Sequence, residues 1–391
     1  MCYFNLGDLH KAYLAITSAW MYFHFQEDAL IASAQGEDEK EYPFINMVEI
    51  LVSDYLPTPS TIPSGGKFAD VFYSIGSKCI EHGYFEGAVV CFDLTIQDNP
   101  QHYKGYSNLG TCLLEIGKFA EGVRPLLKAL EINPSDEITY FGLSVIFLSL
   151  DYPDFALPCA KKALNIRPTY DRVKNILPAI NELNKISPYK SKVEGLYGSA
   201  RIAGLVINPL AAKNLREAND LQLSSQGTRN SDIVRGFGAA LETELRDFFL
   251  PLMSEKNSTD KSTQTNYHRD LTLGSLAMLI GDGFTNLIQN DYHPSVKKGN
   301  SAVRASLKSD YHITEDELNR FANNVGTVSI LRNSAAHGES LTAQNAEQCK
   351  LHVQISLEHL MRLRLNHVLG NRYEYSKNIT LVKNGQEIRL I

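Results

Sequence analysis

Three prolines at a constant spacing constrain the fold of this chain more than any other feature. Pro100, Pro134 and Pro168 follow one another at intervals of 34 residues. The same register aligns residues of similar kind: Phe72/Tyr106/Tyr140, Ile75/Leu109/Leu143, Gly76/Gly110/Ser144, Gly83/Gly117/Asp151, Ala88/Gly122/Ala156 and Thr95/Ala129/Ala163. A fixed period of this length indicates stacked copies of one small unit, because a single copy cannot bury its own apolar face.

This pattern closely resembles the tetratricopeptide repeat, a hairpin of two helices. Small residues let the two helices approach, the glycine serves the turn, and the proline ends the second helix. The third repeat departs at its turn, where Asp151, Tyr152 and Pro153 replace the glycine-x-aromatic pattern, but its spacing is kept. The resemblance implies an all-α superhelix over residues 68–186, which includes a capping helix at 171–185.

In such repeats the first helix of each hairpin lines a concave groove. The resemblance places these residues in the groove: Tyr73, Ser77, Lys104, Ser107, Thr111, Leu114, Phe141, Val145 and Leu148. The set is largely apolar with one basic residue, whereas a clamp for a peptide carboxylate needs several converging cationic or amide side chains. We expect either an apolar helix or extended peptide of a partner protein, or the chain's own flanking helices, to occupy the groove.

Composition narrows the class of protein. The chain has 391 residues, 43% of them hydrophobic, which is enough for two or three domains. Its six cysteines are scattered without metal-ligand spacing, so we expect reduced thiols, a cytoplasmic location, and neither metal nor cofactor. Residues 1–60 are expected to form helices, with no signal peptide or membrane span.

Charge is distributed unevenly along the chain. The net charge is -6, yet from Ser231 onward 18 Lys and Arg balance 18 Asp and Glu. The acidic surplus therefore lies in residues 1–230, and we expect any contact with RNA in the part of the chain from Ser231 onward.

The C-terminal part is expected to be a helical domain over residues 231–370, joined to the repeats by a linker at 187–230. Apolar periodicity predicts helices at 233–253, from 270 onward, from a capping box at Thr314 and Glu317 to a stop at Gly338, and at 344–369. The pair Asn384 and Gly385 predicts a hairpin turn between two strands in the tail, 371–391.

The order of motifs in this domain resembles the HEPN superfamily, the higher eukaryotes and prokaryotes nucleotide-binding domains. The motifs are Glu-x-Glu-Leu-Arg at 242–246, Leu-Thr-Leu-Gly at 271–274 and Leu-Arg-Asn-x-Ala-Ala-His-Gly at 331–338. The resemblance implies a helical bundle that forms a homodimer and acts as a metal-independent endoribonuclease of a defence or toxin type. It assigns catalytic roles to Arg332, Asn333 and His337, with Glu244 as a weaker candidate.

The chemistry of these residue types fits RNA cleavage. Attack by the 2'-hydroxyl needs a base, an acid and positive charge beside the phosphate, which two imidazoles and a guanidinium supply. Four basic residues could guide single-stranded RNA or tRNA, or could simply form a solvated loop: Lys297, Lys298, Arg304 and Lys308. The alternative is a non-catalytic scaffold protein, in which Arg332 and His337 only satisfy a helix end and the bundle dimerises or binds nucleotide.

Overall fold

The computed structural model describes residues 69–193, 202, 204–225, 229–256, 271–281, 303–372, 380–383 and 386–389. These residues fall into two compact units that meet in sequence between Lys118 and Phe119, and each unit is described by itself. The helices expected in residues 1–60 lie outside the described part of the chain.

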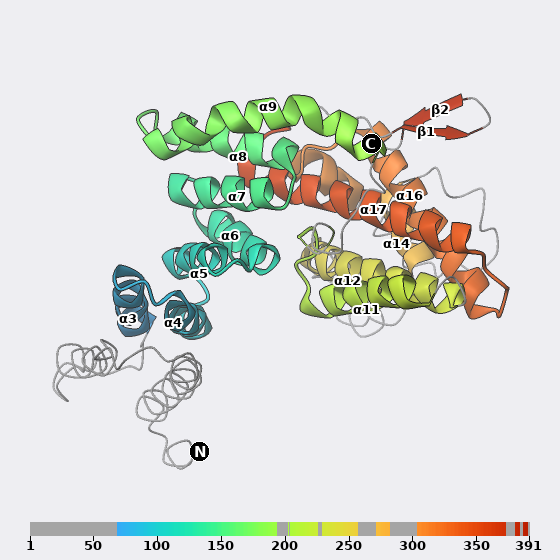
Figure 1. Ribbon diagram of the computed structural model, residues 1–391, viewed down its shortest axis with the longest axis horizontal. Helices are drawn as coiled ribbons and strands as arrows, with labels where there is room; N and C mark the ends of the chain where they lie inside the picture. The colour runs from blue at the N-terminus through green and yellow to red at the C-terminus, as the bar shows by residue number, and fades with distance from the viewer. Residues whose placement is uncertain are drawn as a thin grey trace, which may run out of the picture. The chain divides into compact units, whose positions relative to one another are not determined.

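The first unit contains one complete repeat and the start of the next. Its helices are α3 (Ala69–Glu81), α4 (Phe85–Asp98) and α5 (Tyr103–Glu115) (Figure 1). Gly76 lies so close to α4 that an added Cβ would be 2.8 Å from Cε1 of Phe92. This contact explains the small residue at that position of the period. The unit's core consists of Cys79, Ala88, Phe92, Leu109, Cys112 and Leu113.

The second unit combines helical hairpins with a helical bundle. Its helices are α6 (Phe119–Ile132), α7 (Glu137–Ser149), α8 (Pro153–Ile166), α9 (Asp171–Val193), α11 (Pro209–Ser224), α12 (Asn230–Lys256), α14 (Leu273–Ile280), α16 (Glu315–Ala336) and α17 (Ala343–Leu369), and residues 303–310 are also helical. In the tail β1 (Thr380–Lys383) pairs with β2 (Gln386–Arg389) in an antiparallel hairpin. The predicted all-α fold with tetratricopeptide-type hairpins is confirmed.

The turn of the third repeat keeps its geometry without glycine. Gly83 and Gly117 have φ angles of 78° and 77°, and Asp151 adopts 60° at the equivalent position. Aspartate tolerates this left-handed conformation better than most residues with a side chain. Pro153 then opens α8 at a position where its missing N–H costs nothing.

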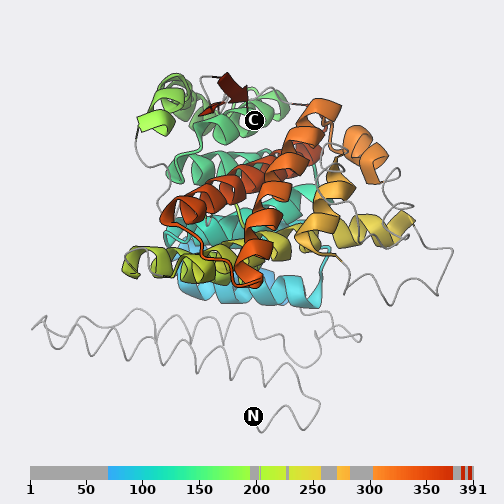
Figure 2. The same ribbon diagram turned by 90° about the vertical axis from the view of Figure 1, so that its right-hand side faces the viewer.

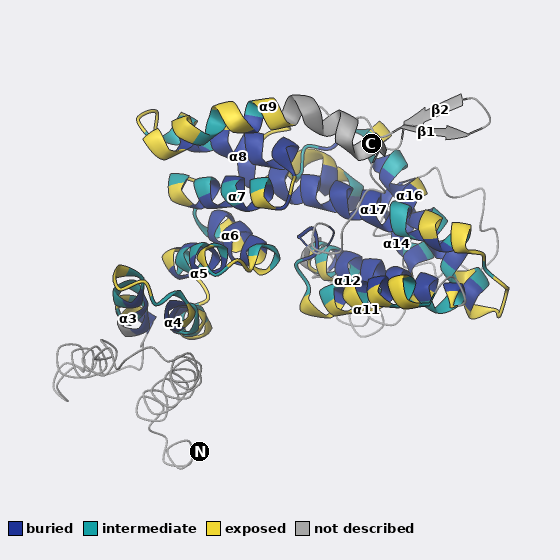
Figure 3. Cartoon of the chain, viewed as in Figure 1, coloured by how far each residue is buried: buried dark blue, intermediate teal, exposed yellow. Residues whose placement is uncertain are grey.

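Helix α17 ties the third repeat to the bundle. It packs against α12 and α16, and also against α6 and α8, the second helices of consecutive hairpins (Figures 1 and 2). The Tyr140 hydroxyl donates a hydrogen bond to the carbonyl of Val368 at 2.6 Å, and Lys162 Nζ donates to that of Leu369 at 3.1 Å. Figure 3 shows α17 buried along most of its length. The third repeat and the C-terminal bundle therefore share one core.

The segment expected to be a linker, residues 187–230, contains the helix α11. The start of this helix has a sequence signal, since the Asn208 side chain caps the N–H groups of Leu210 and Ala211, and Pro209 is the first helical residue. The buried face of α11 packs tightly on α12, where an added Cβ on Gly236 would lie 2.8 Å from Cβ of Ala218. Helix α11 is thus part of the bundle, whereas residues 187–193 continue α9.

The expected ends of α16 are confirmed. Thr314 and Glu317 form the capping box, and Gly338 has a φ of 79° directly after the helix. Burial raises the pKa of Glu317, but the hydrogen bonds from Thr314 and the nearby charges of Arg372 and Arg320 outweigh it and lower that pKa overall. The ionised carboxylate therefore caps the helix at neutral pH.

No helix in the described ranges is long and apolar enough to cross a membrane.

Candidate functional site

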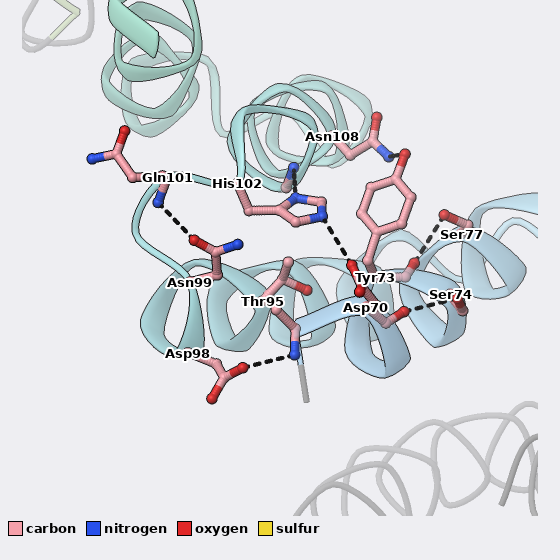
Figure 4. Close-up of polar contacts among 12 residues, drawn as sticks. Asp70, Tyr73, Ser74, Ser77, Thr95, Asp98, Asn99, Gln101, His102 and Asn108 are labelled. Carbon is pink, nitrogen blue, oxygen red and sulfur yellow. Dashed lines mark hydrogen bonds and ion pairs between the residues drawn. The ribbon is translucent and has the colours of Figure 1, made fainter. Parts of the chain in front are cut away.

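In the first unit, the face predicted to line the groove is built on a cluster of polar side chains between α3 and α5 (Figure 4). The His102 side chain caps α5 by accepting the N–H of Gly105 on Nδ1 at 2.9 Å, and its Nε2 lies 3.8 Å from Asp70. The ring of Tyr73 packs on that of His102, with 4.9 Å between ring centroids. These contacts fix the orientation of Tyr73.

Asn108 belongs to this face, although we did not predict it. Its Nδ2 donates to the Tyr73 hydroxyl at 3.3 Å, so α3 and α5 are joined by two half-buried polar groups (Figure 4). Asn108 lies four residues after Lys104 and therefore on the same side of α5, a spacing that could have revealed it.

The other predicted residues of this face divide into exposed, half-buried and buried ones. Lys104 is exposed and Leu114 is half-buried. The hydroxyls of Ser77 and Thr111 donate to carbonyls of their own helices, at 2.9 Å each. Ser107 is 4% exposed, so its assignment to an accessible groove is corrected. The accessible face in this unit is therefore lined mainly by polar side chains.

In the second unit, the corresponding face of α7 is apolar and aromatic. Phe141, Val145 and Leu148 are half-buried. The ring of Phe141 packs against Tyr170, with 5.4 Å between centroids, and the Arg167 guanidinium lies over the same tyrosine ring. Burial raises the pKa of Tyr170, so its phenol stays neutral. This face suits an apolar side chain.

The motif at 331–338 spans the end of α16 and its C-terminal cap, beside α12. Arg332 forms an ion pair with Glu242, and its side chain crosses Gly238 so closely that an added Cβ would be 2.8 Å from Cδ of the arginine. Asn333, the next residue, and His337, the C-cap of the helix, are exposed. Arg235 donates to the carbonyl of Ala335 at 2.6 Å and so holds the end of the helix against α12.

Glu244 has a different environment from the one predicted. It is fully buried, its Oε1 lies 2.8 Å from Arg364, and its two oxygens accept the N–H groups of Ile207 and Asn208 at 3.1 and 2.9 Å. The carboxylate joins three segments, whereas Glu242 is the residue that contacts Arg332. A catalytic role for Glu244 therefore has no geometric support.

Of the four basic residues assigned to RNA, two lie in the described part of the chain. Arg304 donates to the carbonyl of Met278 at 3.2 Å, and Lys308 forms an ion pair with Glu315. Both have structural contacts within the protein, which favours the non-binding alternative for them. Lys297 and Lys298 lie outside the described residues.

Burial keeps the thiols of Cys112 and Cys349 protonated at neutral pH. All five described cysteines are free and buried. Burial raises the pKa of Cys112 and of Cys349 to about 12, and a nearby Cys79 contributes to the shift at Cys112. Since the thiolate is the nucleophilic form, these residues serve the core. The described part of the chain also brings together no group of three side chains suited to a metal ion.

Comparison with known proteins supports the assignment of tetratricopeptide-type repeats. An aligned stretch of 153 residues is 28% identical to the Protein STIP1 homolog of Dictyostelium discoideum and covers 39% of this chain and 26% of that protein. Stretches of 134 residues are 22% and 23% identical to the peroxisomal targeting signal receptors of Pichia angusta and Debaryomyces hansenii; each covers 34% of this chain, and 24% and 22% of those proteins.

These relatives are tetratricopeptide repeat proteins, so repeats of this type are the shared feature. The chain spans about a quarter of the length of each. No family model matches the chain. The similarities favour protein interaction through the repeats and offer no support for a nuclease.

Proposed function

We propose that this protein binds a peptide segment of a partner protein on the first-helix faces of its repeats. The observation that carries the proposal is the half-buried pair Tyr73 and Asn108, which presents polar groups from two adjacent first helices with exposed Lys104 beside it. Two relatives carry the name of a targeting signal receptor, which fits recognition of a short segment.

The side chains of this face suit a peptide in an extended conformation. An extended backbone presents N–H and C=O groups that have no partners within the peptide itself, and the Asn108 amide can both donate and accept. Lys104 adds a positive charge, which favours a segment with acidic side chains.

The first prediction concerns this face. A random peptide library displayed on phage should enrich sequences that bind the full chain. Fluorescence anisotropy should then show that Asn108→Ala lowers the affinity for a selected peptide by about tenfold, because a desolvated group of the peptide loses its hydrogen bond. Lys104→Glu should weaken acidic peptides further. Lys118→Glu, the same charge change at an exposed turn residue, is the matched control and should have little effect. Peptides that bind all these variants equally would contradict the proposal.

RNA cleavage by the C-terminal bundle is a second candidate function. Its support is the placement of Arg332, Asn333 and His337 within the last turns of one helix, with the imidazole exposed and the guanidinium oriented by Glu242. In this proposal the imidazoles of two copies of the chain act on one phosphodiester as base and acid. The alternative for the same domain is a scaffold without catalysis.

Cleavage is tested with purified protein, single-stranded RNA and tRNA in the presence of a chelator. A nuclease of this kind should produce 2',3'-cyclic phosphate ends, and Arg332→Ala and His337→Ala should each reduce the rate by at least about a hundredfold. Arg229→Ala removes an exposed guanidinium from the same bundle and should leave the rate unchanged. If RNA stays intact both with the purified protein and in cells that overproduce it, the non-catalytic scaffold is the better reading of this domain.

A further inference from the structure

Two guanidinium groups share one carboxylate where α12 faces the end of α16. Oε1 of Glu242 lies 2.8 Å from Nη2 of Arg246, and Oε2 pairs with Nη1 of Arg332. Because each guanidinium contacts one of the two oxygens of the same carboxylate, the two guanidiniums lie near each other. Two positive charges against one negative charge leave this group of three side chains with a net positive charge.

The three side chains are held in fixed positions. Nε of Arg246 donates to the carbonyl of Leu271 at 2.6 Å, and the stem of Arg332 lies over Gly238. The Glu242 side chain is only 11% exposed, whereas those of Arg246 and Arg332 are 33% and 32% exposed. The carboxylate therefore lies inside, and the guanidiniums reach solvent.

We propose that Arg246 and Arg332 together bind one phosphate group of a nucleotide, either free or within a polynucleotide, and that Glu242 is the positioning residue. A guanidinium carries several N–H donors in a rigid plane, and the contacts with Glu242 and Leu271 use only part of them. Phosphate is the anion that this geometry suits, since its oxygens accept paired hydrogen bonds from adjacent guanidiniums. An orientation fixed in advance also reduces the entropy lost on binding.

The neighbouring residues favour a nucleotide over a phosphorylated protein. Asn333 directly follows Arg332, and His337 is the C-cap of α16; both residues are exposed. An amide can hydrogen-bond to a base edge, and an imidazole ring can stack on a base. The proposal specifies the ligand of the second candidate function and adds Arg246 to its site, but it uses neither cleavage nor a second copy of the chain.

The test measures binding by the full chain without cleavage. Fluorescence anisotropy of a labelled 12-nucleotide oligouridylate, with chelator at low salt, gives the affinity for a polynucleotide, and calorimetry with AMP gives that for a free nucleotide. Arg246→Gln and Arg332→Gln should each weaken binding by about tenfold. Arg246→Lys keeps the charge but loses the planar pair of donors, so it should recover only part of the affinity. Thermal melting of each variant checks that it folds.

Two comparisons decide between a shared site and diffuse attraction. Arg229→Gln removes the same charge from an exposed position and should change the affinity by less than about twofold. If one phosphate contacts both guanidiniums, the double variant should lose less than the product of the two single losses. Equal losses in the Arg229 and Arg246 variants, multiplicative losses in the double variant, no binding of either probe, or tighter binding of a phosphoserine peptide would each overturn the proposal.

Discussion

Replacing Glu244 with alanine is expected to destabilise the second unit by about 3 to 5 kcal/mol, because breaking a buried ion pair leaves a charge without its partner. Arg364 has a side chain that is 8% exposed and lies 2.8 Å from Glu244. The same change removes the acceptor of two backbone N–H groups, those of Ile207 and Asn208. Chemical denaturation followed by circular dichroism measures the loss.

Two further variants test the reason for this loss. Glu217→Ala removes an exposed glutamate that pairs loosely with Lys213, at 3.8 Å, and should shift the transition by less than about 0.5 kcal/mol. Combining Glu244→Gln with Arg364→Met removes both charges and should recover much of the stability, since a neutral pair carries no unpaired charge. A Glu244→Ala protein as stable as the wild type would show that the buried ion pair does not support this fold.

Replacing Tyr140 with alanine is the second change with a large expected effect, a loss of about 3 to 5 kcal/mol. The side chain is fully buried, and its hydroxyl joins α7 to the last turn of α17. Burial raises the pKa of this hydroxyl well above its usual value, with a smaller contribution from Cys159, so it stays protonated and continues to donate in alkaline solution. Thermal and chemical denaturation measure the total loss.

The contribution of the Tyr140 hydroxyl to stability can be measured separately from that of the ring. Tyr140→Phe leaves the carbonyl of Val368 without this donor and should cost about 1 to 3 kcal/mol. Amide hydrogen exchange should increase at the end of α17, where the contact is lost. Tyr106 occupies the same register position in the preceding repeat and is only half-buried, so Tyr106→Phe should cost less. Unchanged exchange in α17 of the Tyr140→Phe protein would argue against a shared core.

Local patterns were sufficient to predict the helical hairpins and the ends of α16. The period of 34 residues marks the turns, and the turn conformation persists even where Asp151 replaces glycine. The capping box at Thr314 and Glu317 depends on residues three apart, so it is visible in the sequence. Such signals involve neighbours along the chain and therefore do not depend on which helices pack together.

The motif at 242–246 illustrates what sequence alone could not assign. Successive residues of a helix turn by about 100°, so Glu242 and Glu244 point to nearly opposite sides, while Gly238, Glu242 and Arg246 share one side. The sequence identifies these two groups but not which of them faces α16. The packing of α16 on α12 decides that Glu242 meets Arg332 and that Glu244 is buried with Arg364.

The sequence by itself determined the repeat, its turns and the helix ends, because these depend on backbone conformation and contacts between near neighbours. Only the tertiary structure decided that the third repeat shares a core with the bundle, that α11 packs on α12, and that Arg332 pairs with the same carboxylate as Arg246. The physical reason is that these outcomes depend on contacts between residues far apart in sequence, such as Tyr140 with Val368, which no local period records.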